Sequence, residues 1–280
     1  IWYAEFAKNG YLLDVTDRVD ANTKTNIFPA AWDITSVGGK IYGMPWLLDQ
    51  KYFYYNAKML QEAGVANPPR TWEELVQQGQ TLKDKGLVEY PIVWSWGQME
   101  AVICDWVTLL YGNGGRLVDD AGKPVFNDAK GVATLEWMVK SIDDGISNPA
   151  SISYGEEDVR NVFSQGKAAF ASNWVYMYDM ADLNPDESQI NGQVKMALMP
   201  AFEGGPESAT INGSMGFSVI AKSQSADAAW EYVKFLTSEP IQKEFSAHVL
   251  PVWSTQYEGD ALTALTQLNK ANPVTVPAFK

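Results

Sequence analysis

The chain has 280 residues, of which 46% are hydrophobic and 20% charged, a composition typical of a globular protein with one large or two ordinary domains. Its net charge of -13 disfavours contact with nucleic-acid phosphates and anionic lipids, and no basic run is interleaved with aromatic residues. No apolar run reaches the roughly 18 residues that a membrane span requires. The single cysteine, Cys104, excludes an internal disulfide. We therefore expect no nucleic-acid partner, no membrane span and a monomer.

Aromatic residues make up 12% of the chain and include 11 tryptophans. Some of these serve the core, and we assign that role to the five that lie on predicted helix faces or loops: Trp32, Trp72, Trp106, Trp137 and Trp230. The remaining tryptophans are numerous enough to form a stacking surface. Sugars are ligands with flat apolar faces that suit such a surface.

Hydrophobic periodicity and turn residues predict short strands that alternate with longer helices. Expected helices end at Gly10 and Gly64, and others cover residues 71–85, 100–111, 128–143 and 225–236, with shorter ones starting near Glu156 and Ser238. Expected strands cover residues 52–55, 91–94, 168–171, 194–199 and 216–221, and Gly38-Gly39 joins a hairpin of residues 34–37 and 40–44. This alternation indicates an α/β architecture.

The sharpest local signal is Thr71 followed three residues later by Glu74, the pattern of a capping box at a helix N-terminus. In the last long helix we expect Ala229, Tyr232, Val233 and Leu236 to face inward. No Pro-, Gly- or Ser-rich tether divides the chain. Two domains would therefore have to be joined by short crossovers.

The residues that catalysis usually requires are scarce. The only histidine is His248, near the expected end of a helix, which excludes paired-histidine metal motifs and favours a structural role. Phosphate-binding, dinucleotide-binding and calcium-loop motifs are absent. We therefore expect no metal, no cofactor and no catalytic residue, although a carboxylate pair suited to glycoside hydrolysis stays open among the 34 acidic residues.

Four motifs follow one another along the chain. They are a G-x-P strand with an aromatic strand ending in Tyr55-Asn56, an A-G…P-x-T-W-x-E-L pattern over residues 63–75, F-x-x-G-K-A-A-F over 163–170, and A-A-W-x-Y-x-K-F-L over 228–236. This series resembles the family 1 extracellular solute-binding proteins of ABC importers. Residues 94–100 together with 113–115 are similar to the trehalose/maltose-binding branch, with Met99 and a compressed spacing as departures.

The resemblance implies a two-lobed, type II periplasmic-binding-protein fold, with mixed sheets flanked by helices. By matching motifs, we expect short crossovers near residues 46–52, 201–212 and 251–257. Lobe 1 would then comprise residues 1–48 and 208–252, and lobe 2 residues 49–207 and 253–280. Members of the family have further elements before and after the matched region, so we expect the chain to be truncated at both ends.

The resemblance also points to ligand-binding residues in an interlobe cleft. Trp174 matches a position where relatives stack a tryptophan on a sugar ring, and Met215 one where they often carry an aromatic. The full set of candidates is Trp46, Asp49, Trp96, Gln98, Glu100, Trp174, Tyr176, Met215 and Trp253. Aromatic rings would pack on the sugar, and carboxylates would accept its hydroxyls.

The function that the resemblance implies is capture of a di- or oligosaccharide by hinge closure, followed by delivery to an ABC transporter permease without chemistry. The location would be periplasmic or extracellular, with a lipid anchor if the source is Gram-positive. Two alternatives stay open. One is a glycosidase that uses Asp49 and Glu100, and the other is the same fold with a non-sugar ligand such as a polyamine.

Overall fold

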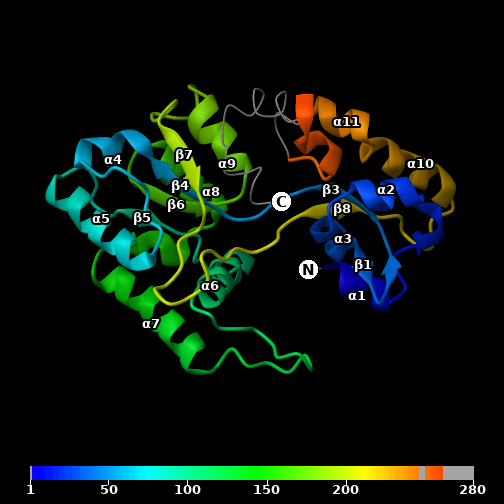
Figure 1. Cartoon of the computed structure of the whole chain (residues 1–280), viewed down its shortest axis with the longest axis horizontal. Coiled ribbons are helices and arrows are strands. Elements are labelled where there is room, and N and C mark those ends of the chain that lie inside the picture. The colour runs from blue at the N-terminus through cyan, green and yellow to red at the C-terminus, as the bar shows by residue number, and fades with distance from the viewer. Residues whose placement is uncertain (1, 246–249, 261–280) are drawn as a thin grey trace. The chain divides into compact units, whose positions relative to one another are not determined.

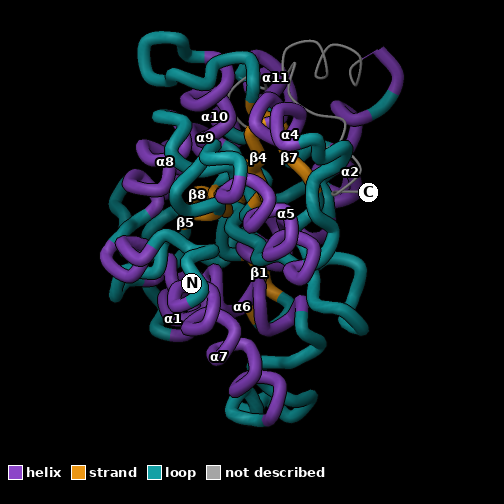
Figure 2. The backbone as a smooth tube through the Cα atoms, turned by 90° about the vertical axis from the view of Figure 1, so that its left-hand side faces the viewer, coloured by secondary structure: helices purple, strands orange, loops and turns teal. Residues whose placement is uncertain are grey.

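The computed structural model describes residues 2–245 and 250–260, and these form two compact units. Unit 1 comprises residues 1–50 and the part of the chain from Asn212 onward, and unit 2 comprises Lys51–Ile211. Both units consist of short strands and more numerous helices (Figure 2). The expected helices and α/β alternation are therefore present. The expected hairpin is present with shorter arms, Ser36–Val37 and Lys40–Ile41. His248 lies outside the described residues.

Unit 1 contains an antiparallel hairpin and a separate antiparallel pair of strands. In the hairpin, Gly38 and Gly39 have φ values of +59° and +78°, which a two-residue turn between twisted strands requires. The strands of unit 1 are β1 (Ser36–Val37), β2 (Lys40–Ile41), β3 (Met44–Leu47) and β8 (Met215–Phe217). Its helices are α1 (Trp2–Lys8), α2 (Ala21–Asn26), α3 (Pro29–Thr35), α10 (Ala226–Leu236) and α11 (Glu239–Glu244), with 3-10 turns at Thr16–Arg18 and Ser254–Tyr257.

Unit 2 is built on one four-stranded sheet in the order β5-β6-β4-β7. Strand β6 runs parallel to β5 and antiparallel to β4, so the sheet is mixed, as the resemblance implies. The strands are β4 (Tyr52–Asn56), β5 (Ile92–Val93), β6 (Phe170–Asn173) and β7 (Val194–Ala197). The helices are α4 (Ala57–Ala63), α5 (Trp72–Asp84), α6 (Glu100–Gly112), α7 (Ala129–Asp143), α8 (Glu156–Ser164) and α9 (Tyr176–Tyr178), with a 3-10 turn at Pro149–Ser153 and a π-helical turn at Asp179–Leu183. Figure 1 shows these elements by label.

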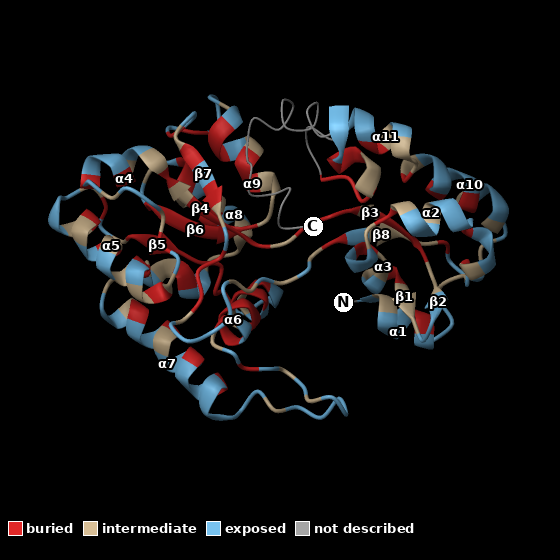
Figure 3. Cartoon of the chain, in the orientation of Figure 1, coloured by how far each residue is buried: buried red, intermediate tan, exposed pale blue. Residues whose placement is uncertain are grey.

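The core of unit 2 is rich in tryptophan. Trp94 and Trp96 stack with ring centroids 5.0 Å apart, and Trp72 lies 5.5 Å from Trp94 and 5.3 Å from Trp137. The strands beneath them are buried, whereas the outer faces of the helices are exposed (Figure 3). Trp72 and Trp137 therefore have the packing role that their positions on predicted helix faces indicated.

Two expectations differ from the structure in unit 1. The strand expected over residues 216–221 is only β8, after which Ile220 makes an isolated bridge to Leu12. On α10, Trp230 and Val233 are buried, whereas Tyr232, expected inward, is 62% exposed. The helix packs along the line of Trp230, Val233 and Thr237, which leaves Tyr232 on the opposite side.

The lobe boundaries also differ at one end. The chain passes between the units at residues 50/51 and 211/212, inside two of the expected ranges. Residues 253–260, which we expected in lobe 2, remain with unit 1: Trp253 bridges to Ile27, and the Tyr257 ring lies 5.3 Å from that of Phe28. These contacts hold the described part of the segment to the first unit.

Helix α5 begins at the predicted cap, and this allows a direct test. The Thr71 hydroxyl accepts a hydrogen bond from the backbone N–H of Glu74 at 3.1 Å, while the Glu74 carboxylate accepts one from the N–H of Arg70 at 2.7 Å. We expect Thr71→Ala to lower the free energy of unfolding by about 1 kcal/mol, because it leaves a helix N–H without its acceptor. Urea unfolding measures this. Thr81→Ala, within the same helix, is the control and should cost nothing; an equal loss in both variants would contradict the assignment.

Candidate functional site

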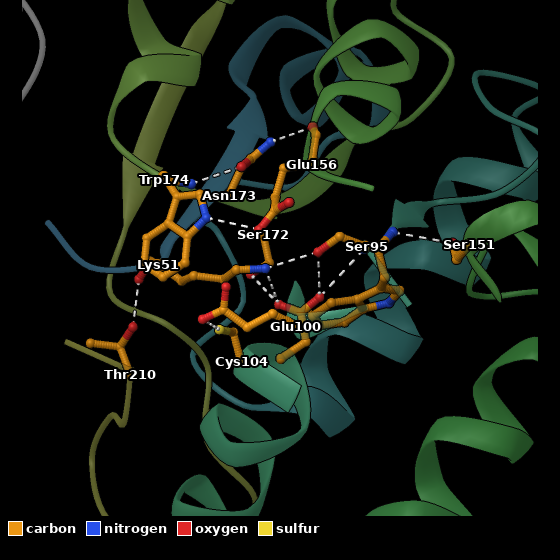
Figure 4. A network of polar contacts seen from close by, with 12 residues as sticks. Lys51, Ser95, Glu100, Cys104, Ser151, Glu156, Ser172, Asn173, Trp174 and Thr210 are labelled. Carbon is orange, nitrogen blue, oxygen red and sulfur yellow. Dashed lines mark hydrogen bonds and ion pairs between the residues drawn. The ribbon is translucent and has the colours of Figure 1, made fainter. Parts of the chain in front are cut away.

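A buried ion pair lies at the centre of unit 2. The Lys51 ammonium is 2.8 Å from the Asp105 carboxylate of α6, and both side chains are completely buried. Lys51 also donates to the Ser95 hydroxyl at 2.9 Å, and the carboxylate accepts hydrogen bonds from Ser95 and Ser172 at 3.0 and 3.2 Å. The arrangement joins residues from just before β4, just after β5, α6 and β6, and Figure 4 shows Lys51, Ser95 and Ser172 within it.

Burial and partners act on Asp105 in opposite directions. Burial raises the pKa of the Asp105 carboxyl, since it removes water from the charged form, while the Lys51 ammonium and the serine hydroxyls oppose that shift. The carboxylate is thus held by its partners and not by solvent. The pair and its hydroxyl partners connect the segments that follow β5 and that form β6.

Trp174 lies directly after β6 and against this pair. The Lys51 ammonium is 5.5 Å from the centre of the indole ring, within the range of a cation–π contact. The indole N–H donates to the Glu156 carboxylate at 3.0 Å, and the backbone N–H of Trp174 donates to the side-chain oxygen of Asn173 at 2.9 Å. The ring itself is half-buried, so part of it remains available for contact.

Two helix N-termini lie beside this tryptophan. The N–H of Gly97, just before α6, donates to the carbonyl of Tyr154, just before α8, at 2.9 Å. A Cβ on Gly97 would lie 2.9 Å from the same carbonyl, so only glycine permits this approach. The first turns of α6 and α8 carry Glu100 and Glu156, and Figure 4 shows both around the Lys51 network.

Cys104 lies on α6 within the same group. Its thiol is 3.8 Å from the Glu100 carboxylate, and burial raises the thiol pKa to about 12, with nearby carboxylates adding to the shift and Lys51 opposing it. We expect native Cys104 to react with iodoacetamide at pH 8 more than about 100-fold more slowly than in urea, because so little thiolate forms. Mass spectrometry of timed samples measures both rates. Similar rates in the two states would show that the thiol is accessible.

The candidates in unit 2 divide into exposed and buried residues. Gln98 and Glu100 are exposed and Trp174 is half-buried, so these three present atoms to solvent on neighbouring elements. Trp96 is only 7% exposed, because its ring stacks on Trp94 in the core. Its surroundings give it a packing role, in contrast to the expected ligand contact.

Tyr176 begins α9 two residues after Trp174. Its side chain is half-buried, and burial, followed by the neighbouring Glu157 carboxylate, raises the pKa of the phenol. The hydroxyl oxygen is fully buried and has no hydrogen-bond partner among the described residues. It remains a candidate hydrogen-bond donor.

In unit 1, Trp46 and Met215 lie on paired strands. The register of β3 and β8 shifts between Pro45 and Leu47, so Trp46 is the extra residue of a bulge, a device that redirects a side chain. Its half-buried ring lies 5.0 Å from that of Phe217, and Met215 opposite Leu47 is 49% exposed.

The other two unit 1 candidates are buried. Trp253 is 6% exposed, and its indole N–H donates to the carbonyl of Thr237 at 2.9 Å, so it packs within the unit in contrast to the expected ligand contact. Asp49 is 8% exposed, and its carboxylate accepts a hydrogen bond from the N–H of Gln50 at 2.9 Å. This bond orients the carboxylate at the end of unit 1.

The residues that support Trp174 were not predicted from the sequence. They are Lys51, Ser95, Asp105, Glu156 and Ser172. One available signal was Asp105, a carboxylate in an otherwise apolar stretch of a predicted helix, since a buried charge needs a partner.

Among residues 2–245 and 250–260, no group of histidine, cysteine, aspartate or glutamate side chains is arranged to hold a metal ion. None of the described helices combines the length and the apolar character needed to cross a membrane.

A protein that binds a small polar solute has such features: α/β units, and aromatic and carboxylate groups beside two helix N-termini. Residues 1–243 match the family model described as "Bacterial extracellular solute-binding protein". The chain belongs to this family of extracellular solute-binding proteins.

Relatives with known names include binding proteins of several kinds. The chain is 33% identical over 268 residues to a "Probable ABC transporter-binding protein" of Deinococcus radiodurans, covering 91% of this chain and 62% of the relative. It is 26% identical over 228 residues to a "Mannitol-binding protein" of Pseudomonas aeruginosa, covering 78% of this chain and 50% of the relative. The chain thus spans less than two thirds of the length of these relatives.

Solved structures have the same fold. The chain is similar to "Maltose bound T. maritima MalE3", with a TM-score of 0.85, 29% identity, and coverage of 99% of this chain and 73% of that one. It is also similar to a solute-binding protein from Agrobacterium radiobacter K84 in complex with ribitol, with a TM-score of 0.85, 26% identity, and coverage of 99% and 70%. These neighbours are type II periplasmic binding proteins, the fold expected from the resemblance.

Proposed function

We propose that this chain binds a neutral carbohydrate or polyol outside the cytoplasm and passes it, chemically unchanged, to an ABC transporter permease. The observation that carries the proposal is the half-buried ring of Trp174, which is held through Glu156 and lies near the exposed Glu100 (Figure 4). An indole face packs on the C–H face of a sugar ring, and a carboxylate accepts hydroxyl groups. The maltose and ribitol complexes of similar proteins support this ligand class.

Trp46, Met215 and Asp49 remain candidate ligand contacts on unit 1. Trp46 and Met215 offer apolar surface, and Asp49 offers a carboxylate fixed by the N–H of Gln50. We do not include Trp96 and Trp253, because the Trp96 ring stacks on Trp94 and the Trp253 indole N–H is already bonded to the Thr237 carbonyl. Tyr176 would add a hydroxyl donor near Trp174.

Calorimetric titration of the chain with maltose, ribitol and D-mannitol tests this proposal. We expect at least one of them to bind with one site per chain, and spermidine and L-amino acids not to bind. Amino acids belong in the panel because one relative, 28% identical, is a "Probable amino-acid ABC transporter periplasmic-binding protein" of Sinorhizobium fredii. Binding of spermidine or an amino acid alone would replace the proposed ligand class.

Chromatography of the titrated maltose separates binding from hydrolysis. We expect maltose to be recovered intact after prolonged incubation. Release of glucose by the chain, abolished by Glu100→Gln, would establish a glycosidase instead and reject the proposed function.

A further inference from the structure

We propose that Lys51 and Asp105 act as a positioning pair that fixes the orientation of the Trp174 indole. The role as ligand support rests on the proposed function, whereas the effect on the ring rests on contacts within unit 2. Neither residue needs to touch the ligand, because both side chains are completely buried.

A buried ion pair such as Lys51 and Asp105 is not required for the stability of a protein. Burying two charges costs several kcal/mol per ion in effect, and a buried pair can often be replaced by apolar residues without loss. Unit 2 also has a large apolar core that does not depend on this pair for its hydrophobic contacts. A buried pair at this position therefore calls for a role other than stability.

The contacts of the pair lie toward Trp174. The ammonium contacts Asp105, the Ser95 hydroxyl and the face of Trp174, at 2.8, 2.9 and 5.5 Å. The carboxylate in turn accepts from Ser172, two residues before Trp174, at 3.2 Å. All of these contacts lie on the segments that lead to Trp174 or to the first turn of α6 with Glu100.

The Trp174 indole is held at one edge and at one face. A single hydrogen bond from the indole N–H to Glu156, at 3.0 Å, fixes one edge but leaves the plane free to tilt about that bond. The Lys51 ammonium on one face removes that freedom, since the ring quadrupole attracts the cation. An edge and a face together define the plane of the indole (Figure 4).

The test uses the full chain labelled with 5-fluorotryptophan and observed by ¹⁹F NMR. The Trp174 resonance is assigned by its disappearance in Trp174→Phe. We expect the double variant Lys51→Met with Asp105→Leu to remain folded, and its Trp174 resonance to shift and broaden more than those of the other tryptophans. We also expect its affinity for maltose, ribitol or D-mannitol, whichever binds the unmodified chain, to fall about tenfold.

Two further variants separate positioning from general packing. Lys51→Arg keeps a cation and should leave the Trp174 resonance closer to that of the unmodified chain than the double variant does. Thr108→Val changes a buried residue of the same helix, three positions after Asp105, and should leave the resonance unchanged. Asp105→Asn, which keeps the side-chain shape, replaces the double variant if that variant does not fold.

An unchanged Trp174 resonance in the folded double variant, or in Asp105→Asn, would overturn the positioning role. A shift of equal size in Thr108→Val would overturn it as well, because the effect would then be general. Failure of all three ligands to bind the unmodified chain would reject the proposed function, while the ¹⁹F comparison would still decide the role of the pair.

Discussion

Replacing Trp174 with leucine is expected to weaken binding of the carbohydrate by about 100-fold or more, through loss of a large aromatic contact at the centre of a binding surface. The ring is half-buried, its N–H is bonded to Glu156 at 3.0 Å, and its position is therefore set before the ligand arrives. A ring ordered in advance costs little entropy on binding. Leucine keeps the apolar character but offers neither the flat face nor the N–H.

Calorimetric titration with maltose, ribitol and D-mannitol, at matched protein concentrations, measures the loss. Trp2→Leu is the matched control, since Trp2 is 63% exposed on α1 in unit 1 and belongs to no candidate site. That variant should bind as the unmodified chain does. Equal affinities of Trp174→Leu and the unmodified chain would remove Trp174 from the binding site.

Lys51→Met alone is expected to lower the free energy of unfolding by about 3–5 kcal/mol, because it leaves the buried Asp105 carboxylate without its cation. Burial already raises the pKa of this carboxyl, and without Lys51 that shift should grow. The variant should then be less unstable at low pH than at neutral pH, since protonation neutralises the unpaired charge. Adding Asp105→Leu should recover most of the lost stability.

Urea unfolding of the single and double variants, followed by circular dichroism at several pH values, measures both effects. The surface pair of Arg18 and Asp227, 2.8 Å apart with side chains 36% and 90% exposed, supplies the control. Arg18→Met should cost less than about 1 kcal/mol, because water screens an exposed pair. A cost for Lys51→Met no greater than this would show that the Asp105 charge is compensated in some other way.

Local sequence signals predicted the local structure well. The glycine pair in the first hairpin, the Thr71 cap and the left-handed Gly64 after α4 each act within a few residues. Their effect depends little on the remainder of the fold. Tyr232 shows the limit, since only the tertiary packing of α10 decides which of its apolar residues face inward.

The candidate site was predictable only in part. The family motifs led to Trp174 and Glu100, but Lys51 and Asp105 are 54 positions apart in the sequence, and no local pattern joins them. Burial could not be predicted from the sequence either. Trp96 and Trp174 are both aromatic candidates in the sequence, and only the structure shows that Trp96 stacks on Trp94. Partners and burial are properties of the folded chain, and a sequence motif indicates a position without its surroundings.

The tryptophan cluster of unit 2 has an optical consequence. Indole transition dipoles 5.0 Å apart couple strongly, so the Trp94–Trp96 pair should give circular dichroism a band that exists only while unit 2 is folded. Unit 1 has no pair of tryptophan rings in contact among its described residues. The band would therefore report the melting of one unit alone. Comparison with the amide signal would show whether the two units unfold together or one after the other.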